Sequence, residues 1–323
     1  MKNKMKLGAQ FLLGYGTVLT LIVAISVTSY IGLNAAVANF NEYRSLARNS
    51  NLSSRVQANM LLVRLHVKEF ILKKNSQSVS DFNARLQMLN NFLNEAAVEI
   101  KDTDRLAHIR EIQQYVEQYN VAFERVVQLM KKREDVVINR LNPQGLAMRT
   151  AISEIMRSAY ESGDAEAAYY AGLLQEALLL GRLYAVKFLS TNAIEDKNRA
   201  QKELNENVSS QVSQLDEVLQ NSLRRELLQD FKEAFEQYRA AFDETAAIIL
   251  ARNKYIKEEL DVIGPKVAES SEVVKLSIQS RQDEIGPAAK AHNELTVERV
   301  LMLSFASVMI GLISSIILLR LIR

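Results

Sequence analysis

The sequence predicts an all-α protein: two stacked four-helix bundles made of six helices, two long and four shorter, flanked by two transmembrane helices. The composition favours helix, because the 323 residues include only 11 Gly and 3 Pro and no Val/Ile/Thr-rich run is bounded by turn dipeptides. Two long apolar segments lie near the two ends of the chain. An internal repeat divides the region between them, so we expect its helices to form two similar bundles.

The first apolar segment predicts a transmembrane helix. Residues 7–41 contain no charged residue, and the Leu7–Leu33 part exceeds the roughly 20 residues needed to cross a bilayer. A cleaved signal peptide would have a shorter apolar run and a small-x-small cleavage site, and Val27-Thr28-Ser29-Tyr30 is a poor one. We therefore expect residues 1–33 to form a cytoplasmic N-terminus and an uncleaved anchor.

The second apolar segment, Val300–Leu319, predicts another span, so that residues 300–323 include this span and the start of a cytoplasmic segment. Lys2, Lys4 and Lys6 precede the first span, Arg299 directly precedes the second, and Arg320 and Arg323 follow the second at its outer end. Because positive residues collect on the cytoplasmic side, we expect both termini in the cytoplasm and residues 34–299 across the membrane.

Five short polar stretches divide residues 34–299 into six helices. Their Asn, Asp, Ser, Thr and Gly residues end one helix or cap the next. The stretches are Asn75-Ser76-Gln77-Ser78, Asp102-Thr103-Asp104, Ser162-Gly163-Asp164, Thr191-Asn192-Ala193 and Asn221-Ser222. The third and sixth helices are then the two long ones, and the sixth is expected to continue into the second span.

One apolar stretch occurs twice. Met60–Ile71 reads MLLVRLHVKEFI and Leu178–Leu189 reads LLLGRLYAVKFL, so Arg64 reappears 118 positions later as Arg182. On a helix of 3.6 residues per turn, the apolar side chains of the first copy share one face, with the arginine at its edge. These apolar residues are Met60, Val63, Val67 and Phe70.

A second match extends the repeat. Glu117-Gln118-Tyr119 corresponds to Glu236-Gln237-Tyr238 at an offset of 119. Each repeat is therefore a short helix, a second short helix and a long helix. This order predicts one bundle next to the membrane, made of residues 34–135 and 265–299, and an outer bundle made of residues 136–264.

Three prolines fall inside the predicted long helices, at Pro143, Pro265 and Pro287. A proline removes one helical hydrogen bond and usually kinks the helix, so we expect bends at these sites, where one bundle passes into the next. The alternative is that they mark ordinary helix ends, which would add helices without changing the plan.

Catalysis is not indicated. The three histidines, His66, His108 and His292, are scattered, and the chain has no cysteine, no His-Glu-x-x-His pair, no glycine-rich phosphate loop and no Gly-x-Ser-x-Gly elbow. The net charge of +2 provides no general attraction for nucleic acid. We expect no enzyme activity, cofactor or metal site, and interpret the charged runs 131–135 and 254–259 as solvated helix faces.

Three features together resemble the helical bimodular sensor domain of bacterial methyl-accepting chemotaxis receptors. They are the run Asn51–Arg64, the run Asp164–Gly172 leading to Arg182-Leu183-Tyr184, and the two Ile-Gly-Pro sites. The similarity covers about residues 40–290. It implies a homodimer in the bacterial inner membrane, with residues 34–299 in the periplasm and small molecules, commonly organic acids, bound in its bundles.

The resemblance leaves the output open. The linker domain and methylated coiled coil expected of a chemoreceptor do not follow Arg320, so the cytoplasmic signalling machinery would be reached through a missing C-terminal region or through another protein. A transmembrane histidine kinase is the alternative, and such a sensor can read a periplasmic binding protein. A structural membrane spacer would explain the long helices but not the repeated arginines.

We expect a small anionic metabolite to bind beside those arginines. An anion that enters a bundle core must exchange its water for charged or hydrogen-bonding partners, and the arginine fork suits a carboxylate. The candidates are Arg55, Asn59 and Arg64 in one bundle, and Tyr170, Gln175, Arg182, Tyr184 and Lys187 in the other. Gly181 replaces Val63 of the first copy and is expected to open space beside Arg182. An inter-helix salt bridge is the alternative role of both arginines.

Overall fold

The computed structural model describes residues 7–322, and within this range every regular element is a helix. The predicted all-α class is confirmed. Four of the positive residues used to predict orientation, Lys2, Lys4, Lys6 and Arg323, lie outside the described residues.

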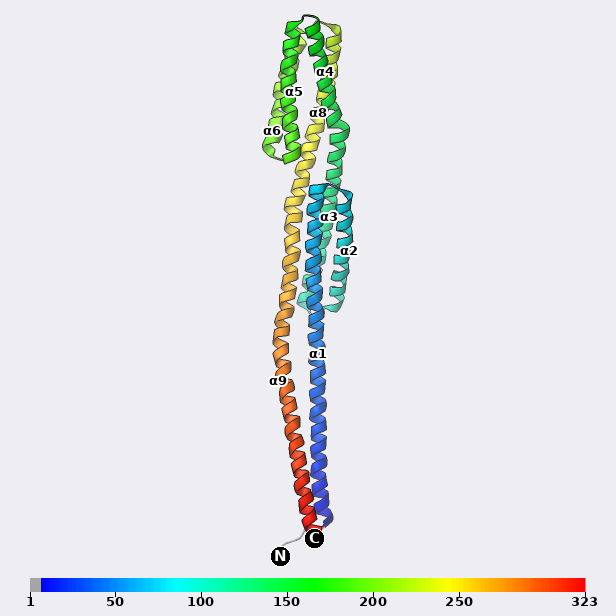
Figure 1. Ribbon diagram of the computed structural model, residues 1–323, viewed down its shortest axis with the longest axis vertical. Helices are drawn as coiled ribbons and strands as arrows, with labels where there is room; N and C mark the ends of the chain where they lie inside the picture. The colour runs from blue at the N-terminus through cyan, green and yellow to red at the C-terminus, as the bar shows by residue number, and fades with distance from the viewer. Residues whose placement is uncertain (1–6, 323) are drawn as a thin grey trace. The chain divides into compact units, whose positions relative to one another are not determined.

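Residues 7–322 form α-helices and three π-helical segments, and Figure 1 shows how the helices are arranged. The elements are α1 (Leu7–Lys73), α2 (Ser76–Glu99), α3 (Thr103–Val136), η1 (Val137–Leu141), α4 (Asn142–Glu161), α5 (Ala165–Thr191), α6 (Ile194–Lys202), η2 (Glu203–Val208), α7 (Ser209–Val218), α8 (Ser222–Lys254), η3 (Tyr255–Leu260) and α9 (Asp261–Ile322). Each π segment joins its two neighbours without a break. The described chain therefore consists of the six predicted helices.

Local sequence explains most helix ends. Oδ1 of Asp164 accepts a hydrogen bond from the N–H of Ala167 at 3.1 Å, and Oδ1 of Asn221 accepts one from the N–H of Arg224 at 3.1 Å. Both are N-caps of the predicted kind. At the ends of helices, Asn192 has φ 59° and Gly163 has φ 74°, conformations that Asn and Gly adopt most readily. The first turn is shorter than predicted, because α2 already begins at Ser76.

Two π segments lie next to prolines of the long helices. η1 directly precedes Asn142-Pro143, and η3 ends shortly before Gly264-Pro265. Proline lacks an N–H and its ring clashes with a preceding carbonyl, and the wider hydrogen-bond pattern of a π turn accommodates both effects. α9 continues as an α-helix through Pro287.

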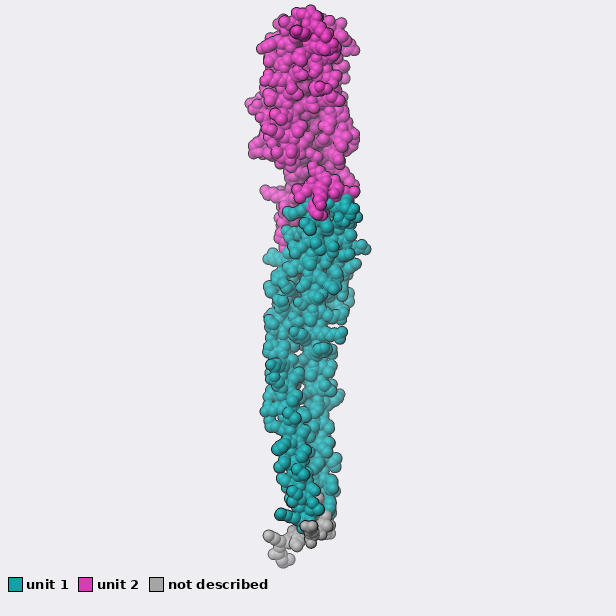
Figure 2. Space-filling view, in the orientation of Figure 1, with its two compact units in different colours: residues 1–68, 77–114, 267–323 teal, residues 69–76, 115–266 magenta. Residues whose placement is uncertain are grey.

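The chain forms two compact units (Figure 2). Unit 1 comprises residues 1–68, 77–114 and 267–323. Hydrogen bonds join its helices in a ring: α1 to α2 through Asn59 and Arg85, α2 to α3 through Asn94 and Gln113, α3 to α9 through Glu111 and Ser270, and α9 to α1 through Ser271 and Ser53. Unit 1 is therefore a four-helix bundle.

Unit 2 comprises residues 69–76 and 115–266. Here α4 packs against α5 and α8, and α5 packs against α6, η2 and α7. The core contains Phe188, Phe231 and Phe242, all fully buried. These contacts make a second four-helix bundle, in which α6, η2 and α7 together form one of the four helices.

α1 and α9 each contain a segment long and apolar enough to cross a membrane. Large apolar side chains of these segments, such as Leu12 and Phe305, are exposed, as lipid-facing residues would be. The two helices approach closely at Gly32: a Cβ atom at this position would overlap Cγ2 of Thr296.

Candidate functional site

The repeated stretch buries corresponding positions in both copies. Met60, Val63, Val67 and Phe70 are buried in the first copy, and Leu178, Gly181, Ala185 and Phe188 are buried in the second. The predicted apolar face is confirmed. The repeat extends to ring contacts, since Phe70 meets Phe123 edge to face at 5.5 Å and Phe188 meets Phe242 edge to face at 6.1 Å.

Arg182 on α5 turns its guanidinium toward the core of unit 2. A Cβ atom added at Gly145 of α4 would lie 3.2 Å from Nε of Arg182 and 3.2 Å from Cε2 of Tyr238. Arg182 also hydrogen-bonds the Tyr238 hydroxyl on α8. The absence of a side chain at position 145 thus leaves room for an arginine between α4, α5 and α8.

The charge of Arg182 acts on Tyr238. Burial raises the pKa of Tyr238 to about 12, against the opposing effects of the charge and the hydrogen bond of Arg182, which both lower it. Among residues 7–322, no carboxylate forms an ion pair with Arg182. The half-buried guanidinium therefore lies beside a neutral phenol and has no carboxylate partner, an environment that favours an anion.

Gly181 does not open a cavity. A Cβ atom there would lie 2.9 Å from Cδ2 of Leu204, and Leu204 is buried. The expectation of free space beside Arg182 is wrong on this side, because Leu204 of the π segment η2 already fills it. The space beside Gly145 is taken by the side chains of Arg182 and Tyr238 themselves.

The other predicted residues of unit 2 form separate contacts. Nε2 of Gln175 donates to Oγ of Ser153 at 3.3 Å. Tyr170 packs against the core and against Tyr169. Tyr184 lies between two cations: Nζ of Lys187 is 4.9 Å and Cζ of Arg199 is 5.4 Å from its ring centre. Tyr184 and Lys187 are thus brought together, with Arg199 as a third member that the sequence did not indicate.

In unit 1, Asn59 and Arg55 form one cluster. Asn59 is 8% exposed; its Nδ2 donates to the Arg55 carbonyl at 2.8 Å, and its Oδ1 accepts from Nη1 of Arg85 at 3.3 Å. The Arg55 guanidinium lies 5.2 Å from the ring centre of Phe92. Arg85 and Phe92 come from α2, so these residues only meet when α1 and α2 pair.

Arg55 also lines a surface groove of about 340 Å³. Three arginines of α1 border it, Arg44, Arg48 and Arg55, together with Glu95 of α2. The excess of positive charge makes this groove suitable for an anion.

Arg64 is half-buried at the edge of the same apolar face. Among the described residues, no hydrogen bond connects it to Asn59 or Arg55. The five-residue spacing explains the separation, since it places Arg64 on a different side of α1 from Asn59.

The residues that sequence reasoning missed lie on partner helices. Tyr238 was identified only as part of the internal repeat, and Gly145 and Arg85 were assigned no role. The internal repeat pointed to one of them, because Tyr238 corresponds to Tyr119 of the first copy. No such signal exists for Arg85.

No protein-family model matches the chain, and no curated protein sequence matches it.

Proposed function

We propose that this protein is a membrane-anchored sensor that binds a small organic anion in its helical bundles and signals by helix displacement. The proposal follows the chemoreceptor resemblance: a homodimer in the bacterial inner membrane, with residues 34–299 in the periplasm and both termini in the cytoplasm. The protein acts without catalysis of its own and passes its signal to cytoplasmic machinery.

The observation that supports this proposal best is the environment of Arg182. Its guanidinium is held by Tyr238 and accommodated by Gly145, and no carboxylate forms an ion pair with it within residues 7–322. A salt bridge, the alternative role, would require such a partner. A carboxylate ligand accepting two hydrogen bonds from the fork would complete the site.

The continuous helices suit signal transfer. The helix that begins at Ser222 contributes Tyr238 to this site and continues through η3 and α9 into the second apolar segment. A ligand shifts the equilibrium between two helix arrangements only by its preference for one of them. A ligand that contacts Arg182 and Tyr238 together would favour the arrangement of α5 and α8 that fits it.

Calorimetric titration of the full chain in detergent micelles tests the proposal. The panel consists of acetate, di- and tricarboxylates and amino acids, at constant ionic strength. We expect saturable binding of at least one organic acid, lost in Arg182→Ala and retained in Arg149→Ala, an exposed arginine of α4. Absence of heat from every acid, or full affinity in Arg182→Ala, would contradict the proposal.

One observation favours the alternative of a sensor that reads a binding protein. Leu179, Leu183 and Val186 are exposed to 50, 49 and 61% and share one face of α5. Such a face would suit a protein partner. Replacing Leu183 with Lys should abolish the response to a periplasmic extract in this case, and should leave organic-acid binding unchanged.

A further inference from the structure

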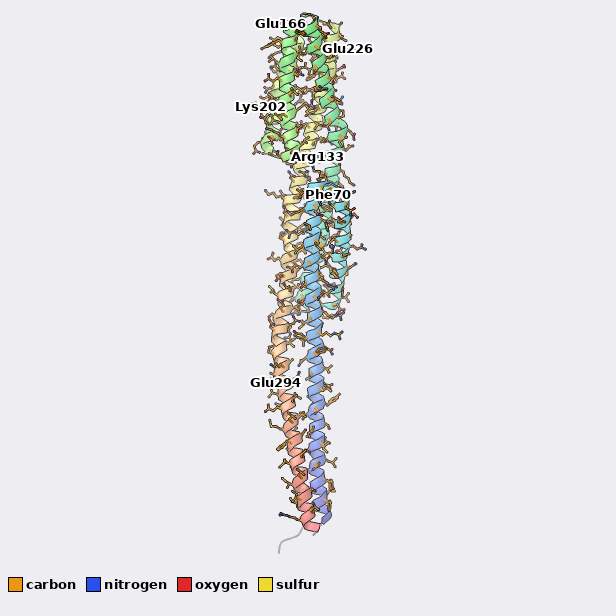
Figure 3. All side chains as sticks on the ribbon, in the orientation of Figure 1. Phe70, Arg133, Glu166, Lys202, Glu226 and Glu294 are labelled. Carbon is orange, nitrogen blue, oxygen red and sulfur yellow. The ribbon has the colours of Figure 1, made fainter. Side chains whose placement is uncertain are left out.

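Two arginines meet at the C-terminal end of α5. Nη2 of Arg133, from α3, donates to the carbonyl of Leu189 at 2.9 Å. Nη2 of Arg252, from α8, donates to Oδ1 of Asn192 at 3.1 Å, and Nη2 and Nε of the same side chain donate to Oδ1 of Asn253 at 2.7 and 3.1 Å. Arg133 is labelled in Figure 3. Three helices thus bring two positive charges to one turn of unit 2.

The arginines are equivalent positions of the internal repeat. Arg252 follows Arg133 by 119 residues, the same offset that relates Tyr238 to Tyr119. The interpretation of residues 131–135 as a solvated face is wrong for Arg133, which is half-buried, while its neighbours in that run are exposed. Arg252 is 7% exposed.

This pair lacks a counter-charge. No carboxylate forms an ion pair with Arg133 or Arg252 within residues 7–322. The nearby acids are engaged elsewhere: Glu244 pairs with Lys132 and Arg140, and Asp196 accepts a hydrogen bond from Thr191. Glu134, adjacent to Arg133 in the chain, acts on it only through its charge.

The burial of the two groups is costly. Nε of Arg133 is buried without a hydrogen-bond partner. Burial lowers the pKa of both arginines, and the charge of Arg133 lowers the pKa of Arg252 further. The carbonyl end of α5 compensates part of this cost through its dipole. One buried and one half-buried like charge, together with the unused Nε donor of Arg133, still favour the binding of an anion.

We propose that Arg133 and Arg252 form a binding site for a small oxyanion at the C-terminal end of α5. Nη1 of Arg252, and Nε and Nη1 of Arg133, make no hydrogen bond within residues 7–322, and phosphate and carboxylate oxygens accept from such donors. An anion held by both would tie α3, α5 and α8 together, and its release would leave their charges to repel each other. The site therefore makes the packing of these three helices dependent on an anion.

This site is distinct from that at Arg182. Arg182 and Leu189 are separated by seven residues of α5, about 10 Å along the axis, and Tyr238 and Arg252 by fourteen residues of α8, about 21 Å. The two sites use different arginines and different neighbours. Their ligands can therefore be tested separately.

The test is calorimetric titration of the full chain in detergent micelles with inorganic phosphate, in sodium chloride at constant ionic strength. We expect one saturable phosphate site. Arg252→Gln should weaken it at least about tenfold, or roughly 1.4 kcal/mol, while Arg182→Ala and the exposed Arg149→Ala leave it unchanged. Sulfate and acetate titrations show whether the site requires a tetrahedral anion.

A second variant covers the case in which Arg252→Gln does not fold. Arg133→Lys keeps the charge and loses the fork, so it should fold and also bind phosphate more weakly. The proposal is overturned if the unmodified chain shows no saturable phosphate binding, if Arg133→Lys binds phosphate as tightly as the unmodified chain, or if Arg182→Ala abolishes the binding instead. The last result would leave the proposed organic-acid site intact.

Discussion

The turn between α4 and α5 depends on one buried arginine. Arg224 of α8 is 5% exposed; its Nη1 donates to Oγ of Ser162 at 2.9 Å, and its Nη2 lies 3.0 Å from Oδ2 of Asp164. The Asp164 side chain is 31% exposed and also caps α5. We predict that removing Asp164 and removing Arg224 both destabilise the protein, but by different amounts.

The difference follows from which charge is left behind. Asp164→Ala leaves Arg224 buried without its counter-ion, which typically costs 3–5 kcal/mol, and also removes a cap worth about 1 kcal/mol. Because Asp164 is partly exposed and water can take its place, we expect a total of about 3 kcal/mol. Arg224→Met leaves an aspartate that water can solvate, and loses one hydrogen bond of about 1 kcal/mol and one ion pair with a partly exposed carboxylate, worth about 0–1 kcal/mol. Its expected cost is about 1–2 kcal/mol.

Urea denaturation of the full chain in detergent micelles, followed by far-ultraviolet circular dichroism, measures these free energies. Asp164→Asn is the matched control, because asparagine keeps the cap and an acceptor oxygen but removes the charge. Its cost should fall below that of Asp164→Ala. The double variant Asp164→Ala/Arg224→Met should cost less than the sum of the single variants by at least about 1 kcal/mol.

Additive effects of the two substitutions would refute this reasoning. So would a larger cost for Arg224→Met than for Asp164→Ala, since that order would mean that the arginine stabilises the turn through packing and not through its charge.

Three further predictions concern other parts of the chain. The pKa of Tyr238 is about 12 in the folded state and near 10 in the unfolded state, so the free energy of unfolding should fall between these pH values. Tyr238→Phe should lack this part of the fall. Arg182→Met should raise the pKa of Tyr238, measured by absorbance titration. Gly32→Ala should force α1 and α9 apart and lower the melting temperature, and Thr296→Ala should restore it, because it removes the overlapping Cγ2. Phe188→Ala should lower the free energy of unfolding by about 3–5 kcal/mol, measured by urea denaturation, and an unchanged value would contradict its place in the core.

Much of the fold was predictable from sequence because it depends on local signals. The caps at Asp164 and Asn221, the left-handed residues Gly163 and Asn192, and the apolar period of α1 each act within a few residues. The repeat extended this reach, since burial of one stripe predicted burial of its copy. It also related Arg64 to Arg182 and thereby identified the arginine that meets Tyr238.

The contacts of each arginine were decided by the tertiary structure alone. Arg182 meets Gly145 and Tyr238, Leu204 fills the space beside Gly181, and Arg133 meets the end of α5. All join segments that are far apart in sequence. A helical period determines which face of a helix is apolar, but not its axial register or rotation against its neighbours. Only the packed bundle decides which charged side chains at the edge of a face meet an acceptor and which meet another charge.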